Sequence, residues 1–200
     1  MQNRLFIVHG YQANPQKHWF EWLTQQFPHL PHHIVSMPDS QSPKLHKWLD
    51  TLQDAIGTVD EHTYIIGHSL GCTTVLQFLA KQAPFVKVGG VLLVAGFVQR
   101  LDNLPQLDAF NQQQLPWPQL QSMVTHKQVL LSQDDEVVSP SATEHLSQLW
   151  QAPLLKLSGY GHFTEQDGCK CLPEAQHWLH EALQSSCSQP ERYLEASLKD

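Results

Sequence analysis

Residues 63–74 of the chain read TYIIGHSLGCTT, which changes from a strand-like to a helix-like pattern within a few positions. The opening residues are β-formers that suit a buried strand, and apolar residues then recur at helical spacing as far as Leu79. Ser69 therefore stands at the turn between a strand and a helix, with Gly67 and Gly71 on either side.

A Gly-x-Ser-x-Gly turn between a strand and a helix is typical of a nucleophile elbow. Such a turn holds the serine in a strained backbone conformation and leaves little room for side chains at the two glycines. We expect Ser69 Oγ to be exposed above the sheet and the backbone N–H of Leu70, at the start of the helix, to donate to an oxyanion. The alternative is an ordinary loop in which the serine only caps the helix.

The composition favours one globular domain with an excess of negative charge. The chain has 200 residues, 41% of them hydrophobic, which suffices for one core. We expect a single domain over residues 1–184 with a small insertion near 97–120. A polar extension over 185–200 is expected to add a helical turn through Leu194 and Leu198. The net charge of −7 and the lack of a basic cluster argue against nucleic acids and membranes as partners.

The sequence gives no targeting or membrane signal. The first residues lead directly into a strand-like segment, without the apolar region and cleavage site of a signal peptide. No apolar run is long enough to span a bilayer. We therefore expect a cytoplasmic protein.

The cysteines are too few and too unevenly spaced for a disulfide framework. They are Cys72, Cys169, Cys171 and Cys187. The pair Cys169 and Cys171, followed by His177 and His180, suggests a zinc site, but the spacing differs from a Cys-x-x-Cys pair. Because both histidines also fit one face of a terminal helix, we expect no metal.

Strands and helices alternate along the chain. The expected strands are 5–8, 32–37, 63–66, 88–96, 129–132 and 153–157. The expected helices are 15–27, capped by Asn14, then 43–56, 70–79, 141–150 and 173–183. This alternation predicts an α/β fold in three layers, with a mostly parallel sheet of about six strands and helices on both faces.

A base and an acid for Ser69 are expected where parallel strands end. Serine is a weak nucleophile unless a base lies within hydrogen-bond distance and an acid orients that base. His162, in a glycine-lined loop after strand 153–157, is the candidate base, although it could instead cap the last helix. Asp134 and Asp135 follow strand 129–132, so the chain order is Ser, Asp, His, as in α/β-hydrolases.

Two further parts of the site can be assigned from the residues. We choose Asp135 as the acid because Glu136-Val137-Val138 follows it, as in many α/β-hydrolases, and Asp134 remains the alternative. The loop after strand 5–8 contains Gly10 and Tyr11, and we expect the Tyr11 backbone N–H to be the second oxyanion donor beside that of Leu70.

The segment 97–120 mixes apolar residues with Asn, Gln and prolines and has no clear periodicity. It is either a small cap over the site or a connector packed on the core. If it is a cap, Phe97 and Trp117 are candidates to line a modest apolar acyl pocket.

Taken together, these motifs resemble the small serine hydrolases of the α/β-hydrolase superfamily, in particular the YdeN-like group that includes retinoblastoma-binding protein nine. The motifs are His9-Gly10-Tyr11, His18-Trp19-Phe20-Glu21-Trp22-Leu23, Met37-Pro38-Asp39, Gly67-His68-Ser69-Leu70-Gly71, Asp135-Glu136-Val137-Val138 and Gly161-His162-Phe163. The resemblance implies the α/β-hydrolase fold with strand order 2-1-3-4-5-6, a triad of Ser69, Asp135 and His162, and no cofactor.

We therefore expect a serine hydrolase that cleaves small carboxylic esters, or related acyl bonds, through an acyl-enzyme. Its partner would be a small acyl ester, and the protein would be a monomer or a weak homodimer. The alternative is a hydrolase-like fold that serves as a protein-interaction module with little or no turnover.

Overall fold

The computed structural model describes residues 2–187 and contains a parallel six-stranded sheet with the order β2-β1-β3-β4-β5-β6, as the family resemblance predicted. The strands are β1 Arg4–Val8, β2 His32–Val35, β3 Thr63–His68, β4 Val88–Val94, β5 Val124–Ser132 and β6 Leu154–Leu157. The expected helical turn through Leu194 and Leu198 lies outside the described residues.

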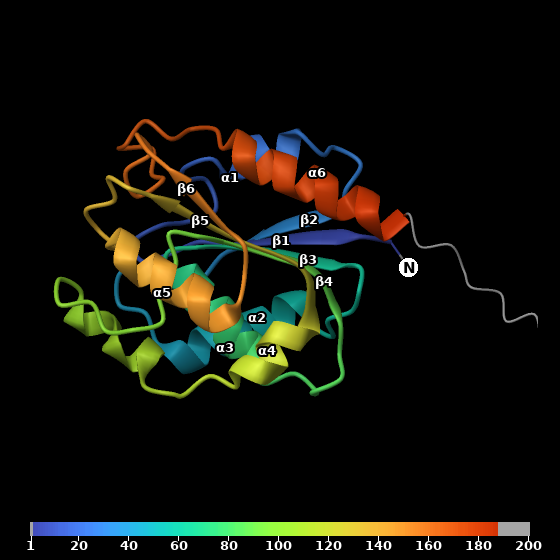
Figure 1. Cartoon of the computed structure of the whole chain (residues 1–200), viewed down its shortest axis with the longest axis horizontal. Helices are drawn as coiled ribbons and strands as arrows, with labels where there is room; N and C mark the ends of the chain where they lie inside the picture. Colours follow the sequence, from blue (N-terminus) through green and yellow to red (C-terminus); the bar gives the residue numbers. More distant parts are fainter. Residues whose placement is uncertain (1, 188–200) are drawn as a thin grey trace, which may run out of the picture.

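Helices cover both faces of the sheet, so the three-layer α/β prediction is confirmed (Figure 1). The helices are α1 Phe20–Gln25, α2 Leu45–Ile56, α3 Leu70–Ala80, the 3₁₀ helix η1 Pro105–Asn111, α4 Trp117–Met123, α5 Pro140–Trp150 and α6 Pro173–Cys187. Helices α1 and α6 lie on one face, and α2 to α5 lie on the other.

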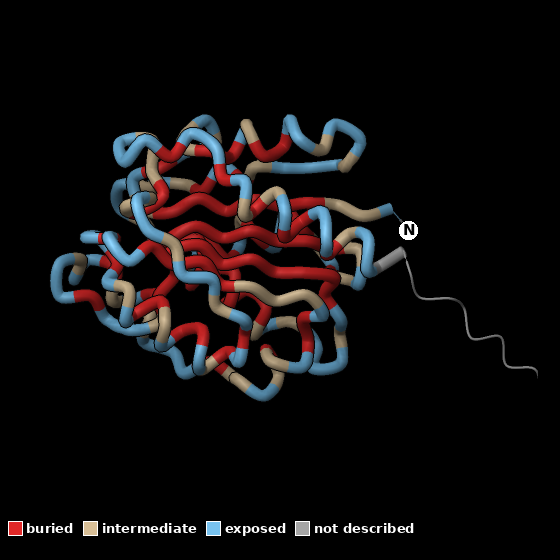
Figure 2. The backbone as a smooth tube through the Cα atoms, turned by 45° about the horizontal axis from the view of Figure 1, so that its top comes forward, coloured by how far each residue is buried: buried red, intermediate tan, exposed pale blue. Residues whose placement is uncertain are grey.

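The sheet separates two clusters of buried apolar side chains. One cluster includes Trp48 of α2 and Trp150 of α5, and the other includes Phe20 of α1 and Leu179 of α6. Strands β3 and β4 are buried along their whole length, whereas the exposed residues lie at the outer surface of the helices, in the loops and in parts of β2, β5 and β6 (Figure 2). The central strands therefore give the site at their ends a rigid support.

Helix α1 begins at Phe20 and not at Pro15, where the sequence predicted its start. Asn14 does not cap a helix: its Oδ1 accepts a hydrogen bond from the Gln16 N–H at 3.0 Å, which closes a local turn. His18 then has φ 62°, in the left-handed region, and this conformation prevents the helix from starting earlier.

The segment 97–120 forms η1 and the beginning of α4. Its apolar residues Leu107, Phe110 and Leu120 are buried in the same cluster as α3, as expected of a connector packed on the core. Leu104 also reaches the cavity beside Ser69, so one residue of this segment contributes to the site.

Strand β5 begins five residues earlier than the sequence predicted, at Val124. Residues 125–128 are mostly polar and only partly buried, so they lack the apolar run by which the strand was recognised. They nevertheless pair with β4, for example His126 with Gly90.

None of the helices within residues 2–187 combines the length and the apolar character that crossing a membrane would require. The same residues contain no group of three or more His, Cys, Asp or Glu side chains placed to hold a metal ion. Cys169 is buried, and its thiol contacts the Cys171 carbonyl oxygen at 3.4 Å.

Candidate active site

Ser69 lies between the end of β3 and the first residue of α3, at the carboxyl edge of the sheet. Its backbone has φ 54° and ψ −122°, a conformation that residues other than glycine rarely adopt. The Ser69 N–H donates to the Val94 carbonyl oxygen at 2.9 Å, which fixes the turn against β4. Ser69 is only 5% exposed, but it lines a cavity, so its hydroxyl is reached through that cavity and not from an open surface.

The two glycines of the turn are required by close backbone contacts. A Cβ atom at Gly67 would lie 2.9 Å from the backbone N and Cα of Cys72, and one at Gly71 would overlap the Val8 carbonyl oxygen. Strand β1 therefore packs directly against the start of α3. This packing brings the loop after β1 next to Ser69.

A chain of hydrogen bonds joins Ser69, His162 and Asp135. His162 Nδ1 lies 2.8 Å from Asp135 Oδ2, and its Nε2 lies 2.9 Å from Ser69 Oγ. Because a carboxylate only accepts, Nδ1 carries the proton and Nε2 is free to accept from the serine hydroxyl. This arrangement can deprotonate the serine as it attacks an electrophilic carbon.

Asp135, and not Asp134, contacts the histidine. Asp135 is buried, and its Oδ1 accepts the backbone N–H groups of Val137 and Val138, both at 2.9 Å, which fixes the carboxylate. Asp134 is exposed and instead accepts hydrogen bonds from the loop that carries His162, at Gly159 and Gly161. Asp134 thus stabilises the conformation of the loop that carries His162.

The expected oxyanion donors lie on both sides of Ser69. Leu70 is the first residue of α3, where backbone N–H groups have no acceptor within the helix. Tyr11 follows Gly10, and a Cβ atom at Gly10 would lie 2.9 Å from the Ser69 Cβ and 3.3 Å from its Oγ. The backbone before Tyr11 therefore passes immediately beside the nucleophile candidate.

The cavity at Ser69 has a volume of about 280 Å³, and both polar and apolar side chains line it. Its lining residues come from the loops after β1, β3, β5 and β6 and from the segment before η1. They are Gly10, Tyr11, Gln12, Ala13, Lys17, His18, His68, Ser69, Leu104, Val137, His162, Thr164 and Gln166.

Phe97 and Trp117, expected to form an acyl pocket, do not line this cavity. Phe97 is fully buried in the core, and its carbonyl oxygen accepts from Thr73 Oγ1. Trp117 packs against the same core at the start of α4. The apolar wall of the cavity comes from Ala13, Leu104 and Val137 instead.

Two further histidines next to the site are neutral and have fixed tautomers. His68 donates from Nε2 to the His162 carbonyl oxygen at 2.8 Å, and burial holds its pKa well below the usual value. His9 donates from Nδ1 to the Gly10 carbonyl oxygen and accepts the Met37 N–H at Nε2, and burial lowers its pKa as well. Both rings support the backbone of loops that carry site residues.

Lys17, His18, Thr164 and Gln166 line the cavity, although no role was predicted for them from the sequence. The only signal was that His18 begins one of the motifs of the family resemblance. Lys17 forms an ion pair with Glu165, and the His18 ring accepts the Glu165 N–H, so these contacts join the loops after β1 and β6.

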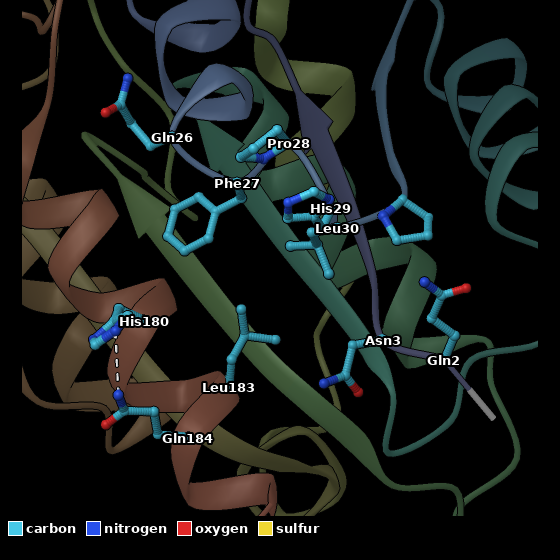
Figure 3. Close-up of a pocket in the computed structure, with 11 residues that line it drawn as sticks. Gln2, Asn3, Gln26, Phe27, Pro28, His29, Leu30, His180, Leu183 and Gln184 are labelled. Atoms are coloured by element: carbon cyan, nitrogen blue, oxygen red, sulfur yellow. Dashed lines mark hydrogen bonds between the residues drawn. The ribbon is translucent and has the colours of Figure 1, made fainter.

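A larger cavity of about 770 Å³ lies at the opposite edge of the sheet (Figure 3). It is bounded by the residues before β1, the turn between α1 and β2, and the last turns of α6, with Phe27, Leu30 and Leu183 as its main apolar side chains. Among the residues that the structure describes, its lining contains no serine, cysteine or carboxylate. The nucleophile candidate Ser69 lines the smaller cavity.

Comparison with known proteins gives a consistent set of relatives. The model of a family described as serine hydrolase matches residues 5–181. YdeN of Bacillus subtilis (strain 168) is 36% identical over 175 residues, which is 86% of this chain and 92% of YdeN. The crystal structure of the ydeN gene product matches with a TM-score of 0.88 at 34% identity, covering 92% of this chain and 100% of that chain.

A more distant match shows the fold alone. Est1E from Butyrivibrio proteoclasticus, solved with bound ferulic acid, has a TM-score of 0.68 at 13% identity, covering 94% of this chain and 90% of Est1E.

Proposed function

The chain belongs to the serine hydrolase family, and from this premise we propose that it hydrolyses small carboxylic esters through an acyl-enzyme on Ser69. The observation that carries the proposal is the hydrogen-bonded series from Ser69 Oγ through His162 to the buried Asp135 carboxylate. It opens into a cavity at the carboxyl edge of the sheet, where α/β folds bind their ligands.

The proposed reaction has two steps. Ser69 Oγ attacks the ester carbonyl carbon while His162 Nε2 takes its proton, and the backbone N–H groups of Tyr11 and Leu70 donate to the oxyanion. The protonated His162 then gives this proton to the leaving alkoxide as the bond between the carbonyl carbon and that oxygen breaks. A water molecule, deprotonated by His162, then attacks the acyl carbon, and as the bond from this carbon to Ser69 Oγ breaks, His162 returns the proton to Oγ and the acid is released. Asp135 orients the ring and stabilises the imidazolium throughout.

The size of the cavity supports a short acyl group. A volume of about 280 Å³ is at or below the lower end of small-molecule sites. Leu104 and Val137 are apolar and can contact a few methylene groups. We therefore propose acetyl to butanoyl esters as the preferred acyl range.

The first experiment is labelling of the purified protein with a fluorophosphonate, which reacts with activated serines. We expect labelling of the wild type and its loss in Ser69→Ala. Hydrolysis of 4-nitrophenyl acetate should fall by about 10⁴-fold in Asp135→Asn, because the histidine loses its orienting acceptor. Asp134→Asn is the matched control, and it should change the rate by only a few fold because Asp134 does not contact the ring.

The outcomes separate the proposal from its alternative. A folded wild type that is not labelled would contradict an activated serine and favour an interaction module with this fold. Equal rate losses in Asp134→Asn and Asp135→Asn would contradict the assignment of the acid. A rate that keeps rising from butanoyl to octanoyl esters would contradict the short acyl range.

A further inference from the structure

His18 is held in an unusual backbone conformation in the wall of the cavity. Its φ of 62° lies in the left-handed region, which residues other than glycine adopt only in a few per cent of cases, with Asn, Asp and His the most frequent among them. The conformation turns the chain between the strand β1 and the helix α1, so that the ring stands beside Ser69 and His162 in the cavity lining. Such a conformation persists only when the surrounding contacts hold it in place.

The contacts of His18 fix which ring nitrogen carries the proton. Nδ1 accepts the Glu165 backbone N–H at 3.2 Å, so the proton of the neutral ring is on Nε2. Burial lowers the pKa of His18 to about 4, which keeps the ring neutral near pH 7. Within residues 2–187, the hydrogen bond of the His18 ring is the one at Nδ1, and Nε2 is not among the fully buried atoms that lack a partner, so its N–H is open to a ligand or to solvent.

His18 lies on the same side of the cavity as the loop that carries His162. The rings of His18 and His68 are 5.3 Å apart, and those of His68 and His162 are 5.1 Å apart. Glu165, to which His18 is bonded, belongs to the same loop as His162. Because His162 must protonate the leaving oxygen, that oxygen and its substituent lie on the His162 side of Ser69.

The charge of the wall favours a neutral acceptor over an anion. Lys17 is the cation nearest to His18 in the cavity lining, and its ammonium group is paired with the Glu165 carboxylate. A carboxylate on the substrate would therefore meet a cation that is already neutralised. Thr164 and Gln166 on the same loop are uncharged and polar.

We infer that the His18 Nε2–H donates a hydrogen bond to an uncharged oxygen on the leaving group of the ester. The preferred substrates are then short-chain esters of alcohols that carry an ether, hydroxyl or carbonyl oxygen near the ester bond, rather than esters of plain alkyl alcohols. This inference rests on the proposed function, because it specifies the alcohol part of the substrate of the same site.

The test compares two esters that differ by one atom, 2-methoxyethyl butanoate and n-butyl butanoate. The ratio of their kcat/KM values is measured in the wild type, in His18→Phe, which removes the donor, and in His18→Asn, which keeps an N–H donor and tolerates a positive φ. We expect the ratio to fall about fivefold in His18→Phe, the worth of one uncharged hydrogen bond. In His18→Asn it should stay within about twofold of the wild type. Each ratio is taken within one sample, so it does not depend on the fraction of protein that is folded.

A second pair of esters tests whether His18 contacts the leaving group and not the acyl group. Methyl methoxyacetate and methyl butanoate carry the same one-atom difference in the acyl group, and their ratio should be the same in all three proteins. An unchanged ratio for the leaving-group pair in His18→Phe would overturn the inference, as would a change confined to the acyl pair. In both cases fluorophosphonate labelling of Ser69 would still stand, whereas failure of the proposed function would show as no labelling of the wild type.

Discussion

At the scale of single residues, Ser69 and Gly57 share one backbone conformation. Ser69 has φ 54° and ψ −122°, and Gly57, at the end of α2, has φ 66° and ψ −132°. Glycine adopts this region without steric cost, whereas another residue is destabilised there by about 1–3 kcal/mol. The fold therefore holds its nucleophile candidate in a conformation that suits a glycine.

We predict that Ser69→Gly is more stable than Ser69→Ala. Both variants lack the hydroxyl, so the difference isolates the backbone. Glycine relieves the backbone strain at this position, and this effect should exceed the free-energy cost of ordering the more flexible glycine. The free energy of unfolding of Ser69→Gly should therefore be about 1 kcal/mol larger than that of Ser69→Ala. Urea unfolding of the two variants measures it, and equal midpoints would show that the turn is not strained.

Asp134 makes the stability of the folded protein depend on pH in the acid range. The carboxylate accepts hydrogen bonds from Ser132 Oγ at 2.6 Å, from the Gly159 N–H at 2.7 Å and from the Gly161 N–H at 3.2 Å. The bond from the Ser132 hydroxyl, followed by that from the Gly159 N–H, lowers the pKa of Asp134 to about 2. The folded state therefore binds this proton less readily than the unfolded state, in which an aspartate titrates near a pKa of about 4.

The sign of this shift sets the predicted result. The stabilisation from Asp134 is complete above pH of about 5 and is lost as the pH falls from about 4 toward 2. Asp134→Asn should be less stable than the wild type at pH 6, and the difference should shrink at pH 2.5. Urea unfolding at the two pH values measures this, with Glu136→Gln as the control that removes one charge from the same loop. A difference that grows in acid would contradict the assignment.

At the scale of elements, the contact between β1 and α3 depends on Gly71. A methyl group there would overlap the Val8 carbonyl oxygen and come within 2.8 Å of the His9 carbonyl oxygen. Backbone atoms cannot rotate away as a side chain can, so strand and helix would have to separate.

Gly71→Ala is therefore predicted to lower the free energy of unfolding by at least about 3 kcal/mol. It should also abolish fluorophosphonate labelling, because the β1 loop would move away from Ser69. Gly57→Ala is the matched control: it has no neighbour within 4 Å of an added Cβ, so it should cost stability through its positive φ but keep the labelling. Labelling retained in Gly71→Ala at wild-type rate would show that the loop adjusts without harm.

The elements that were predicted well from the sequence are those whose signal lies within their own residues. The strands β1 and β4 are apolar runs between turn residues, and the turn at Ser69 is marked by its glycines. The start of α1 was wrong because it depends on His18, which is bonded to Glu165 at the other end of the chain. The start of β5 was missed because its pairing with β4 compensates for polar residues.

At the scale of the whole molecule, the parallel topology explains why much of the site could be predicted. All strands end at one edge, so the residues that follow them meet there, and Ser69, Asp135 and His162 lie within hydrogen-bond distance as a result. The part of the cavity wall formed by Lys17, His18, Thr164 and Gln166 could not be predicted in this way. It depends on how two loops far apart in the sequence pack together, and neither loop has a regular pattern.

The same topology places Cys72 at the centre of the fold, directly behind Ser69. The thiol is fully buried and contacts the Val94 carbonyl oxygen at 3.4 Å, and a Cβ atom at Gly96 would lie only 2.7 Å from the Cys72 Cβ. Burial raises the pKa of the Cys72 thiol far above its usual value, so almost no thiolate forms in the native state. Cys171, in contrast, is exposed.

We predict that Cys72 reacts with iodoacetamide only when the whole domain unfolds. Its packing joins α3 to β4, so no small local opening can expose the sulfur without separating helix from sheet. The free energy of opening from its labelling rate should agree within about 1 kcal/mol with that from urea unfolding, while Cys171 should react at the rate of a free thiol. Peptide mass spectrometry follows each cysteine separately. A much lower opening free energy for Cys72 would mean that α3 and the turn at Ser69 detach while the sheet remains folded. The element that carries the nucleophile candidate would then be mobile and not part of the rigid centre of the molecule.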